Sequence, residues 1–181
     1  MFSINEYEND IGGNEMESDI DATHQALNLF FQNKFDEART KLNPKCKNMY
    51  HYHGLTSLSI LEALMSFETD IFTKTINNAE KTLIATEILS TQQGYRYWSD
   101  EQLHACLIRA ESIIFKTIAN IMQSGTDIFA IAKACFNIRE SYKIFERCQS
   151  MSSTHDWKSE MLKAEFERLG GSYLKLRVVA I

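Results

Sequence analysis

Apolar residues recur at helical spacing along most of this chain, and the pattern is clearest near its start. Within residues 22–44 a polar break at Gln32-Asn33-Lys34 separates two short apolar stretches. The small or apolar positions are Ala26, Leu29, Phe35, Ala38 and Leu42. A small residue on each helix lets two backbones approach closely, so the pattern predicts an antiparallel helix pair. Such pairs stack into α-solenoids, which mostly serve as binding surfaces.

The same periodicity predicts further helices and an all-α fold of about six or seven helices. Ser99 followed by Gln102 is typical of a capping box, and Gly125 is expected to end the helix that follows. Asn33, with Asp36 three residues later, is expected to cap the second helix. The expected helices cover residues 21–32, 33 to before Pro44, 49–67, 69–89, 99–125, 127 onwards and 154–169.

Two features near the C-terminus are distinctive. An apolar seam at alternating steps of three and four calls for a facing helix; it consists of Ile128, Ile131, Cys135, Ile138, Tyr142 and Phe145. Gly170-Gly171 is expected to end the last helix, and the following SYLKLRVVAI is β-branched without a partner strand. Because a lone strand is not stable, this segment is expected to be irregular.

Charge divides the chain unevenly. Residues 1–21 hold seven acidic and no basic residues, whereas the other 160 residues hold 19 basic and 17 acidic ones. We therefore expect an acidic disordered tail over residues 1–20, a helical domain over residues 21–169 and an irregular tail over residues 170–181. A nearly neutral body lacks the basic stripe that nucleic acid would require, so no nucleic-acid partner is expected.

The sequence indicates a cytoplasmic protein. Its start has neither the cationic and apolar regions of a secretory signal nor the basic character of a mitochondrial presequence. No apolar run approaches the about 18 residues of a membrane-spanning helix, so any membrane association would be peripheral. The four cysteines, Cys46, Cys106, Cys135 and Cys148, have no close pair spacing and are interpreted as reduced thiols.

The first helix pair resembles a tetratricopeptide repeat, because Ala26, Asn33, Phe35, Ala38 and Leu42 match its small, turn and packing positions. The order of segments resembles the tetratricopeptide-repeat-39 family, which includes fungal inclusion-body clearance proteins. The matching stretches are ALNLFFQNKFDEARTKL at 26–42, MYHYHGLTSLSILEALMSF at 49–67, DEQLHACLIRAESIIFKTIANIMQ at 100–123 and FNIRESYKIFERC at 136–148.

The resemblance implies a tetratricopeptide-like solenoid that acts as a non-catalytic adaptor for protein partners. It also implies a link to inclusion-body clearance and lipid homeostasis. Two alternatives are a regulator of lipid metabolism at the surface of lipid droplets or another membrane, and a non-functional fragment of a longer solenoid. Family members are several times longer, so we expect this chain to correspond to their N-terminal portion. An uncovered apolar face and self-association would follow.

Two clusters contain residue types that can carry chemistry. Cys46, His51 and His53 lie close together, but zinc needs about four ligands and the two histidines point apart on a helix. His104, Arg109 and Glu111 share one helix, where such charges are usually solvated surface pairs or helix–helix contacts. No nucleophile–base arrangement or phosphate-binding loop is present. We therefore expect no enzymatic activity, no metal and no cofactor.

Two candidate partner-binding sites remain. The aromatic loop Tyr95, Arg96, Tyr97 and Trp98 combines residue types that are enriched at interfaces; alternatively, Tyr97 and Trp98 fold back as a hydrophobic staple. The second candidate is the face of the first pair that carries Phe30 and Phe31. This face also includes Ile20, Thr23 and Leu27. Because it is apolar, it either packs on a neighbouring helix or forms an apolar peptide groove.

Overall fold

The computed structural model describes residues 5–42, 48–91, 98–125 and 127–176. Within these ranges the chain forms seven α-helices and no strand, which confirms the expected all-α fold. The helices are α1 (Asn5–Phe31), α2 (Phe35–Lys41), α3 (Met49–Ser66), α4 (Thr69–Thr91), α5 (Asp100–Ser124), α6 (Ile128–Ser152) and α7 (Glu160–Leu176).

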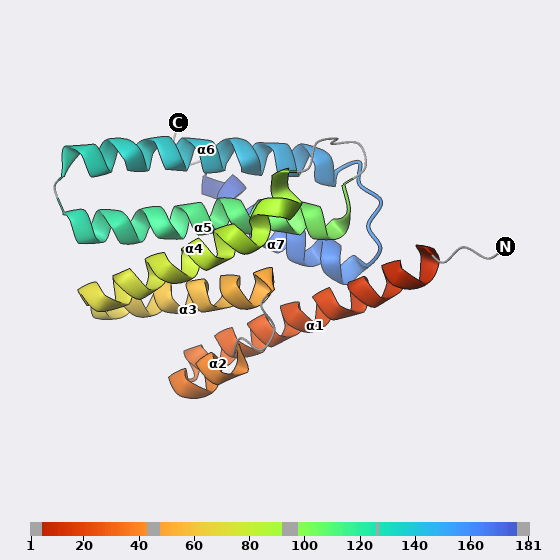
Figure 1. Ribbon diagram of the computed structural model, residues 1–181, viewed down its shortest axis with the longest axis horizontal. Coiled ribbons are helices and arrows are strands. Elements are labelled where there is room, and N and C mark those ends of the chain that lie inside the picture. The colour runs from red at the N-terminus through yellow and green to blue at the C-terminus, as the bar shows by residue number, and fades with distance from the viewer. Residues whose placement is uncertain (1–4, 43–47, 92–97, 126, 177–181) are drawn as a thin grey trace.

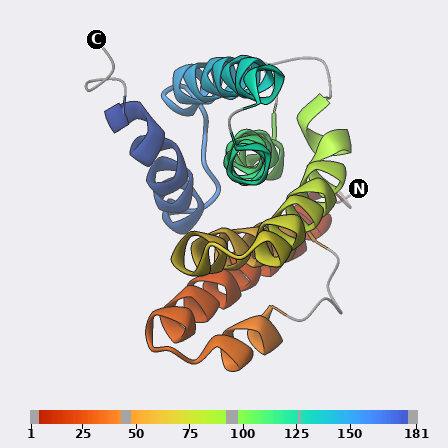
Figure 2. The same ribbon diagram turned by 90° about the vertical axis from the view of Figure 1, so that its left-hand side faces the viewer.

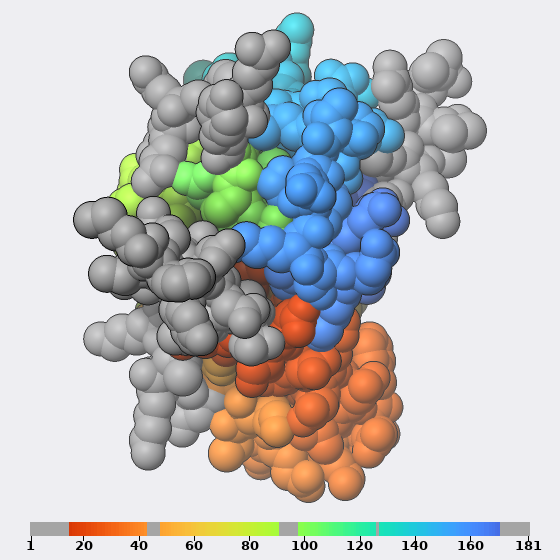
Figure 3. Space-filling view, turned by 90° about the vertical axis from the view of Figure 1, so that its right-hand side faces the viewer, coloured from red at the N-terminus to blue at the C-terminus, as the bar shows by residue number. Residues whose placement is uncertain are grey.

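Helix α5 lies at the centre of the arrangement. It contacts α3, α4, α6 and α7, and Figure 2 shows it end-on with these helices around it. The pair α1–α2 packs below α3, and α1 continues until it also meets α7 (Figure 1). In the space-filling view α2 lies at one end of the molecule and α6 at the other, with α1 between them (Figure 3). This is a stack of helical hairpins of the tetratricopeptide-like kind.

The main core surrounds the inner face of α5. Leu103, Leu107 and Ile108 are at most 1% exposed and belong to a cluster with residues from α1, α3, α6 and α7. A second cluster joins the first helix pair to α3. It contains Ala26, Phe30, Ala38, Leu42 and Leu58. The alanines bring the helices of the first pair close together, and Gly54 on α3 leaves the room that the Leu42 side chain occupies.

Asn33 has a different role from the expected cap. Its backbone has φ 64°, the left-handed conformation that asparagine tolerates better than most residues. Its N–H donates to the carbonyl of Phe30, so Asn33 closes the end of α1. The N-terminal cap of α2 is Lys34, which makes no side-chain capping bond. The prediction that Asn33 caps the second helix is therefore wrong.

The N-terminal stretch belongs to the fold. Helix α1 begins at Asn5, so the expected start at Asp21 and the disordered tail over residues 1–20 are wrong for the described part of this stretch. Met16 and Ile20 are 8% and 0% exposed and lie in the main core. With Thr23 they form a buried stripe; of the acidic residues between them Asp21 is exposed, whereas Asp19 is half-buried and faces His51 on α3. Because acidic residues are so frequent in this stretch, the sequence pattern did not indicate the short buried stripe.

The C-terminal expectation is also corrected. Helix α7 continues through Gly170 and Gly171 to Leu176, so both expected boundaries, 20/21 and 169/170, fall inside helices. Glycine in a helix costs only about 1 kcal/mol relative to alanine, and Leu169 is buried at this point. The packing of α7 on α5 therefore outweighs the local preference to end. Residues 177–181 lie outside the described part.

The predicted capping box of Ser99 and Gln102, the predicted helix end at Gly125 and the predicted helix start near Asp127 are confirmed. Ser99 and Gln102 form the capping box of α5, Gly125 ends that helix with φ 61°, and the Asp127 side chain accepts a hydrogen bond from the N–H of Phe129 at the start of α6. These residues set helix ends through local chemistry.

Replacing Ser99 with alanine should lower the free energy of unfolding by about 1 kcal/mol. The Ser99 hydroxyl accepts a hydrogen bond from the Gln102 N–H at 3.2 Å, and the Gln102 side chain accepts one from the Ser99 N–H at 2.9 Å. The control is Ser150→Ala, an exposed serine on α6, which should change stability by less than about 0.5 kcal/mol. Urea unfolding measures both, and equal effects would contradict the capping role.

Candidate interaction sites and buried polar contacts

A cavity of about 210 Å³ opens between the first helix pair and the end of α3. Its lining consists of Phe30, Phe35, Glu62, Met65 and Ser66. The rings of Phe30 and Phe35 meet edge to face, with their centroids 5.0 Å apart. Arg39 of α2 forms an ion pair with Glu62 beside the cavity. The cavity therefore has an aromatic wall and a charged rim.

Large apolar side chains are exposed around this cavity. Phe31, Met65 and Phe67 are 71%, 68% and 66% exposed. The ring of Phe31 lies 5.9 Å from that of Phe30, so it adjoins the cavity wall. Phe31, Met65, Phe67 and the residues that line the cavity together form a surface that we call the α1–α3 apolar patch. The sequence suggested an apolar face on the first helix pair. On that face Ile20, Thr23 and Phe30 are buried, whereas the Phe31 side chain is exposed.

The aromatic loop is described only at its last residue. Tyr95, Arg96 and Tyr97 lie outside the described residues. Trp98 is 6% exposed and belongs to the main core, as does Leu103 four positions into α5. Trp98 directly precedes the cap residue Ser99, which is the position of a hydrophobic staple. The structure therefore places Trp98 in the core rather than on an open surface.

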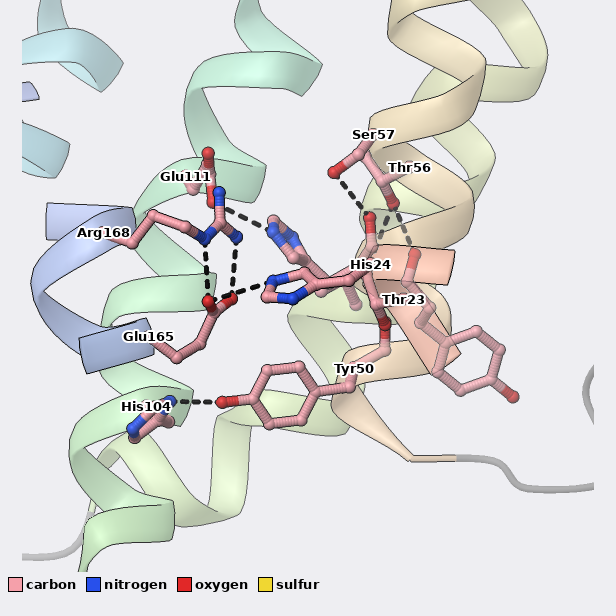
Figure 4. A network of polar contacts seen from close by, with 12 residues as sticks. Thr23, His24, Tyr50, Thr56, Ser57, His104, Glu111, Glu165 and Arg168 are labelled. Atoms are coloured by element: carbon pink, nitrogen blue, oxygen red, sulfur yellow. Dashed lines mark hydrogen bonds and ion pairs between the residues drawn. The ribbon is translucent and has the colours of Figure 1, made fainter. Parts of the chain in front are cut away.

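A buried carboxylate joins the two ends of the described chain. Glu165 on α7 is 6% exposed, and its carboxylate accepts two hydrogen bonds from Arg168, each 2.7 Å long. His24 on α1 lies 3.0 Å from the same carboxylate (Figure 4). The hydrogen bond with Glu165 raises the pKa of Arg168 above its usual value. This cluster ties α7 to α1.

His53 on α3 lies 2.9 Å from Glu111 on α5, and the two side chains are 5% and 13% exposed. On the same helix Arg109 donates a hydrogen bond to the carbonyl of Leu83 at 2.8 Å. Of the two interpretations offered for His104, Arg109 and Glu111, solvated surface pairs are wrong and helix–helix contacts are confirmed.

His104 is fully buried between three helices. Its Nε2 lies 3.0 Å from the carbonyl of Leu162, and its Nδ1 meets the hydroxyl of Tyr50 (Figure 4). A carbonyl only accepts, so Nε2 carries the proton and Nδ1 accepts from the tyrosine. Burial lowers the pKa of His104 to about 4 and raises the pKa of Tyr50 well above its usual value. His104 is therefore a neutral structural histidine near pH 7.

Of Cys46, His51 and His53, the two histidines face different partners. Cys46 lies outside the described residues. His51 contacts Asn48 and lies 3.5 Å from Asp19, whereas His53 faces Glu111. Across the described ranges, no group of three or more His, Cys, Asp or Glu side chains could hold a metal ion.

The apolar seam of α6 is only partly covered. Phe145 is buried, but Ile128, Ile131 and Ile138 are 78%, 44% and 47% exposed, and Cys135 is exposed. Phe129 and Phe136 next to the seam are 86% and 63% exposed. The N-terminal half of α6 therefore presents a second apolar surface, which we call the α6 apolar face.

Cys106 and Cys148 meet between α5 and α6, although they are far apart in the sequence. The interaction between the two thiols lowers the pKa of Cys106 and raises that of Cys148, and burial raises the pKa of Cys148 further. This pair and the polar contacts of Glu165 were missed by sequence reasoning. Each joins helices far apart in the chain, so no local spacing could have revealed them.

Comparison with known proteins identifies the family. The family model Iml2/Tetratricopeptide repeat protein 39 matches residues 24–171. A similar relative is tetratricopeptide repeat protein ttc-39B of Caenorhabditis elegans, which is 26% identical over 169 residues covering 84% of this chain. The chain spans 29% of the length of that relative. No solved structure matches this chain significantly.

None of the helices in the described residues is both long and apolar enough to cross a membrane.

The structure and the family match point to the same family. The helices pair as hairpins with small residues between the helices of the first pair, and the family model matches residues 24–171. On these grounds the chain belongs to the Iml2/tetratricopeptide repeat protein 39 family.

Proposed function

We propose that this protein is a non-catalytic, cytoplasmic interaction scaffold and that the α1–α3 apolar patch binds an apolar side chain of a protein partner. The observation that carries the proposal is the exposure of Met65 in the cavity lining, of Phe31 beside the lining residue Phe30, and of Phe67 next in sequence to the lining residue Ser66. Aromatic residues and methionine are enriched at protein interfaces, and an aromatic pocket suits an inserted anchor side chain. The ion pair of Arg39 with Glu62 supplies a polar rim.

Replacing Phe31 and Met65 together with serine should weaken partner binding by about 30-fold or more, as loss of an interface anchor does. Because both side chains are exposed, stability should change by less than about 1 kcal/mol. The measurement is quantitative mass spectrometry of proteins cross-linked to the tagged chain in cells, followed by direct binding of each enriched protein.

The matched control is Ile84→Ser with Ile88→Ser, two exposed apolar residues on α4 that lie outside the patch. Partners should be lost from the Phe31/Met65 variant and retained by the α4 variant. If all three proteins bind the same partners with equal affinity, the patch is not the binding site.

The family resemblance supports a more specific role in inclusion-body clearance and lipid homeostasis. Cells that lack this protein should then clear protein inclusions more slowly and store more neutral lipid. Restoring the wild-type chain should reverse both effects, and the Phe31/Met65 variant should not. Normal clearance and lipid content in cells without the protein would contradict this role.

A second candidate is a regulator at the surface of lipid droplets or another membrane. The α6 apolar face favours it, because Ile128, Phe129 and Phe136 could insert into a lipid surface. Flotation with neutral and acidic liposomes separates the candidates: a lipid-surface regulator floats, and a pure protein scaffold does not.

The third possibility is a non-functional fragment of a longer solenoid. Such a fragment would self-associate through its uncovered apolar surfaces. Sedimentation equilibrium and thermal unfolding test this directly. A sharply melting monomer would support an autonomous scaffold, and a broad melt with aggregation would support the fragment.

A further inference from the structure

The outer side of helix α6 has the residue spacing of a helix–helix contact, yet no described helix covers it. Steps of four, three and four residues connect Ile128, Ala132, Cys135 and Arg139, whose side chains are all exposed. Helix α6 lies at an edge of the molecule, with α5 beneath it and no described helix on the opposite side (Figures 1 and 2). This spacing is typical of the seam between two paired helices.

Large apolar side chains flank this seam on both sides. At 100° per residue, two phenylalanines lie along one side of it and two isoleucines along the other. They are Phe129 and Phe136, which are 86% and 63% exposed, and Ile131 and Ile138, which are 44% and 47% exposed. Together with Ile128 they present on the order of 700 Å² of apolar surface, close to the roughly 800 Å² that each partner buries in a specific interface. The α6 apolar face is therefore large enough to hold a folded partner.

The charges at the two ends of this face are opposite. Asp127 precedes its first turn and Arg139 stands at its far end. Both side chains are exposed, and neither forms an ion pair with another described residue. If a second copy of α6 lay antiparallel on the first, Asp127 of each copy would meet Arg139 of the other. A parallel pair would place like charges together, which is unfavourable.

We propose that the α6 apolar face binds a second copy of this chain in an antiparallel, two-fold symmetric dimer. The symmetry axis passes between Ala132 and Cys135, so that Ala132 of each copy faces Cys135 of the other. The small alanine side chain lets the two helix backbones approach closely. In the same register, Phe129 of one copy lies near Phe136 of the other. Such a contact uses the same surface on both copies, so association ends at the dimer.

The dimer has a consequence for the binding of partners. Helices α2 and α6 lie at opposite ends of the molecule (Figure 3). A dimer joined at α6 therefore carries its two α1–α3 apolar patches at its far ends, and it would hold two partner molecules at once. This consequence rests on the proposed function, whereas the dimer itself does not.

Sedimentation equilibrium of the purified, reduced full chain tests the dimer. The wild type should show a monomer–dimer equilibrium without larger species. Replacing Phe129 and Phe136 together with serine should raise the dissociation constant by about 100-fold or more, as loss of interface anchors does. The matched control is Phe31→Ser with Met65→Ser, which removes two exposed apolar side chains of the α1–α3 apolar patch and should leave the dimer intact.

Two further variants test the antiparallel register. Arg139→Glu places two acidic side chains together at each end of the contact and should raise the dissociation constant about tenfold. Adding Asp127→Lys makes the charges complementary again and should restore the dimer. Because Cys135 lies near the symmetry axis, a short bismaleimide should join two copies through this residue in a Cys46→Ser background. The peptide pair linked at Cys135 is identified by mass spectrometry.

A wild type that stays monomeric at every concentration would overturn the proposal, and so would a dimer that survives in the Phe129/Phe136 variant. Growth into ever larger species would overturn it in favour of non-specific association. A monomeric wild type that floats with liposomes, together with a Phe129/Phe136 variant that does not, would assign the face to a lipid surface instead. Partner binding through the α1–α3 apolar patch is measured separately, so either idea can fail without the other.

Discussion

Replacing Ile20 with alanine should lower the free energy of unfolding by about 2–5 kcal/mol. Ile20 is fully buried in the main core, beside residues from α5 and α7. Truncation of its side chain removes apolar contact and leaves a cavity that the surrounding helices fill only in part. The large effect is notable because Ile20 lies in the acidic stretch that the sequence suggested would be disordered.

The matched control is Ile88→Ala on α4, where the same side chain is 74% exposed. This change should alter the free energy of unfolding by less than about 0.5 kcal/mol. Urea unfolding followed by circular dichroism measures both variants. If the Ile20 variant were as stable as the Ile88 variant, the segment of α1 that carries Ile20 would not belong to the folded domain.

Acid should destabilise the protein through His104. The pKa of this histidine is about 4 in the folded state and ordinarily 6.5, because burial disfavours its charged form. Between these values the unfolded chain binds the proton and the folded chain does not, so stability falls as pH falls through this window. The contribution is fully present above pH 6.5, and its loss amounts to about 3 kcal/mol by pH 4.

The variant His104→Gln separates this effect from the titration of the carboxylates. Glutamine does not titrate, and it can donate to the Leu162 carbonyl and accept from Tyr50. The free energy of unfolding of each protein is measured by urea titration at several pH values. The wild type should lose about 3 kcal/mol more than the variant between pH 7 and pH 4. If stability fell equally with pH in both proteins, the pKa of His104 would not be lowered in the folded state.

The helix ends that could be predicted are those set by local chemistry. Ser99, Gly125 and Asp127 act on neighbouring backbone groups, so their roles follow from adjacent residues. The part of α1 before Asp21 has Met16 and Ile20 buried in the main core, and α7 passes through Gly170 where it packs on α5. At both places a few buried contacts with other helices stabilise the helix more than the local charges or glycines destabilise it. The residues on the other side of these contacts are distant in the sequence, so a short stretch of sequence does not reveal them.

The candidate sites show the same division. The contact between the two helices of the first hairpin was suggested by residue spacing alone, through Ala26, Phe35, Ala38 and Leu42. The partners of His104 and Cys148 lie on other helices. Their meeting depends on the crossing of helices that are distant in the chain, so residue type and spacing along one helix did not predict it.

The contact between Glu165 and His24 has a consequence for how the molecule unfolds. Repeat arrays are usually open, and each unit then depends only on its neighbours, so the ends can melt first. Here α7 returns to α1, and the array is a loop closed around α5. Neither terminal helix can detach without breaking contacts at the opposite end of the chain. The molecule should therefore lose its structure in one cooperative step rather than by fraying from its ends.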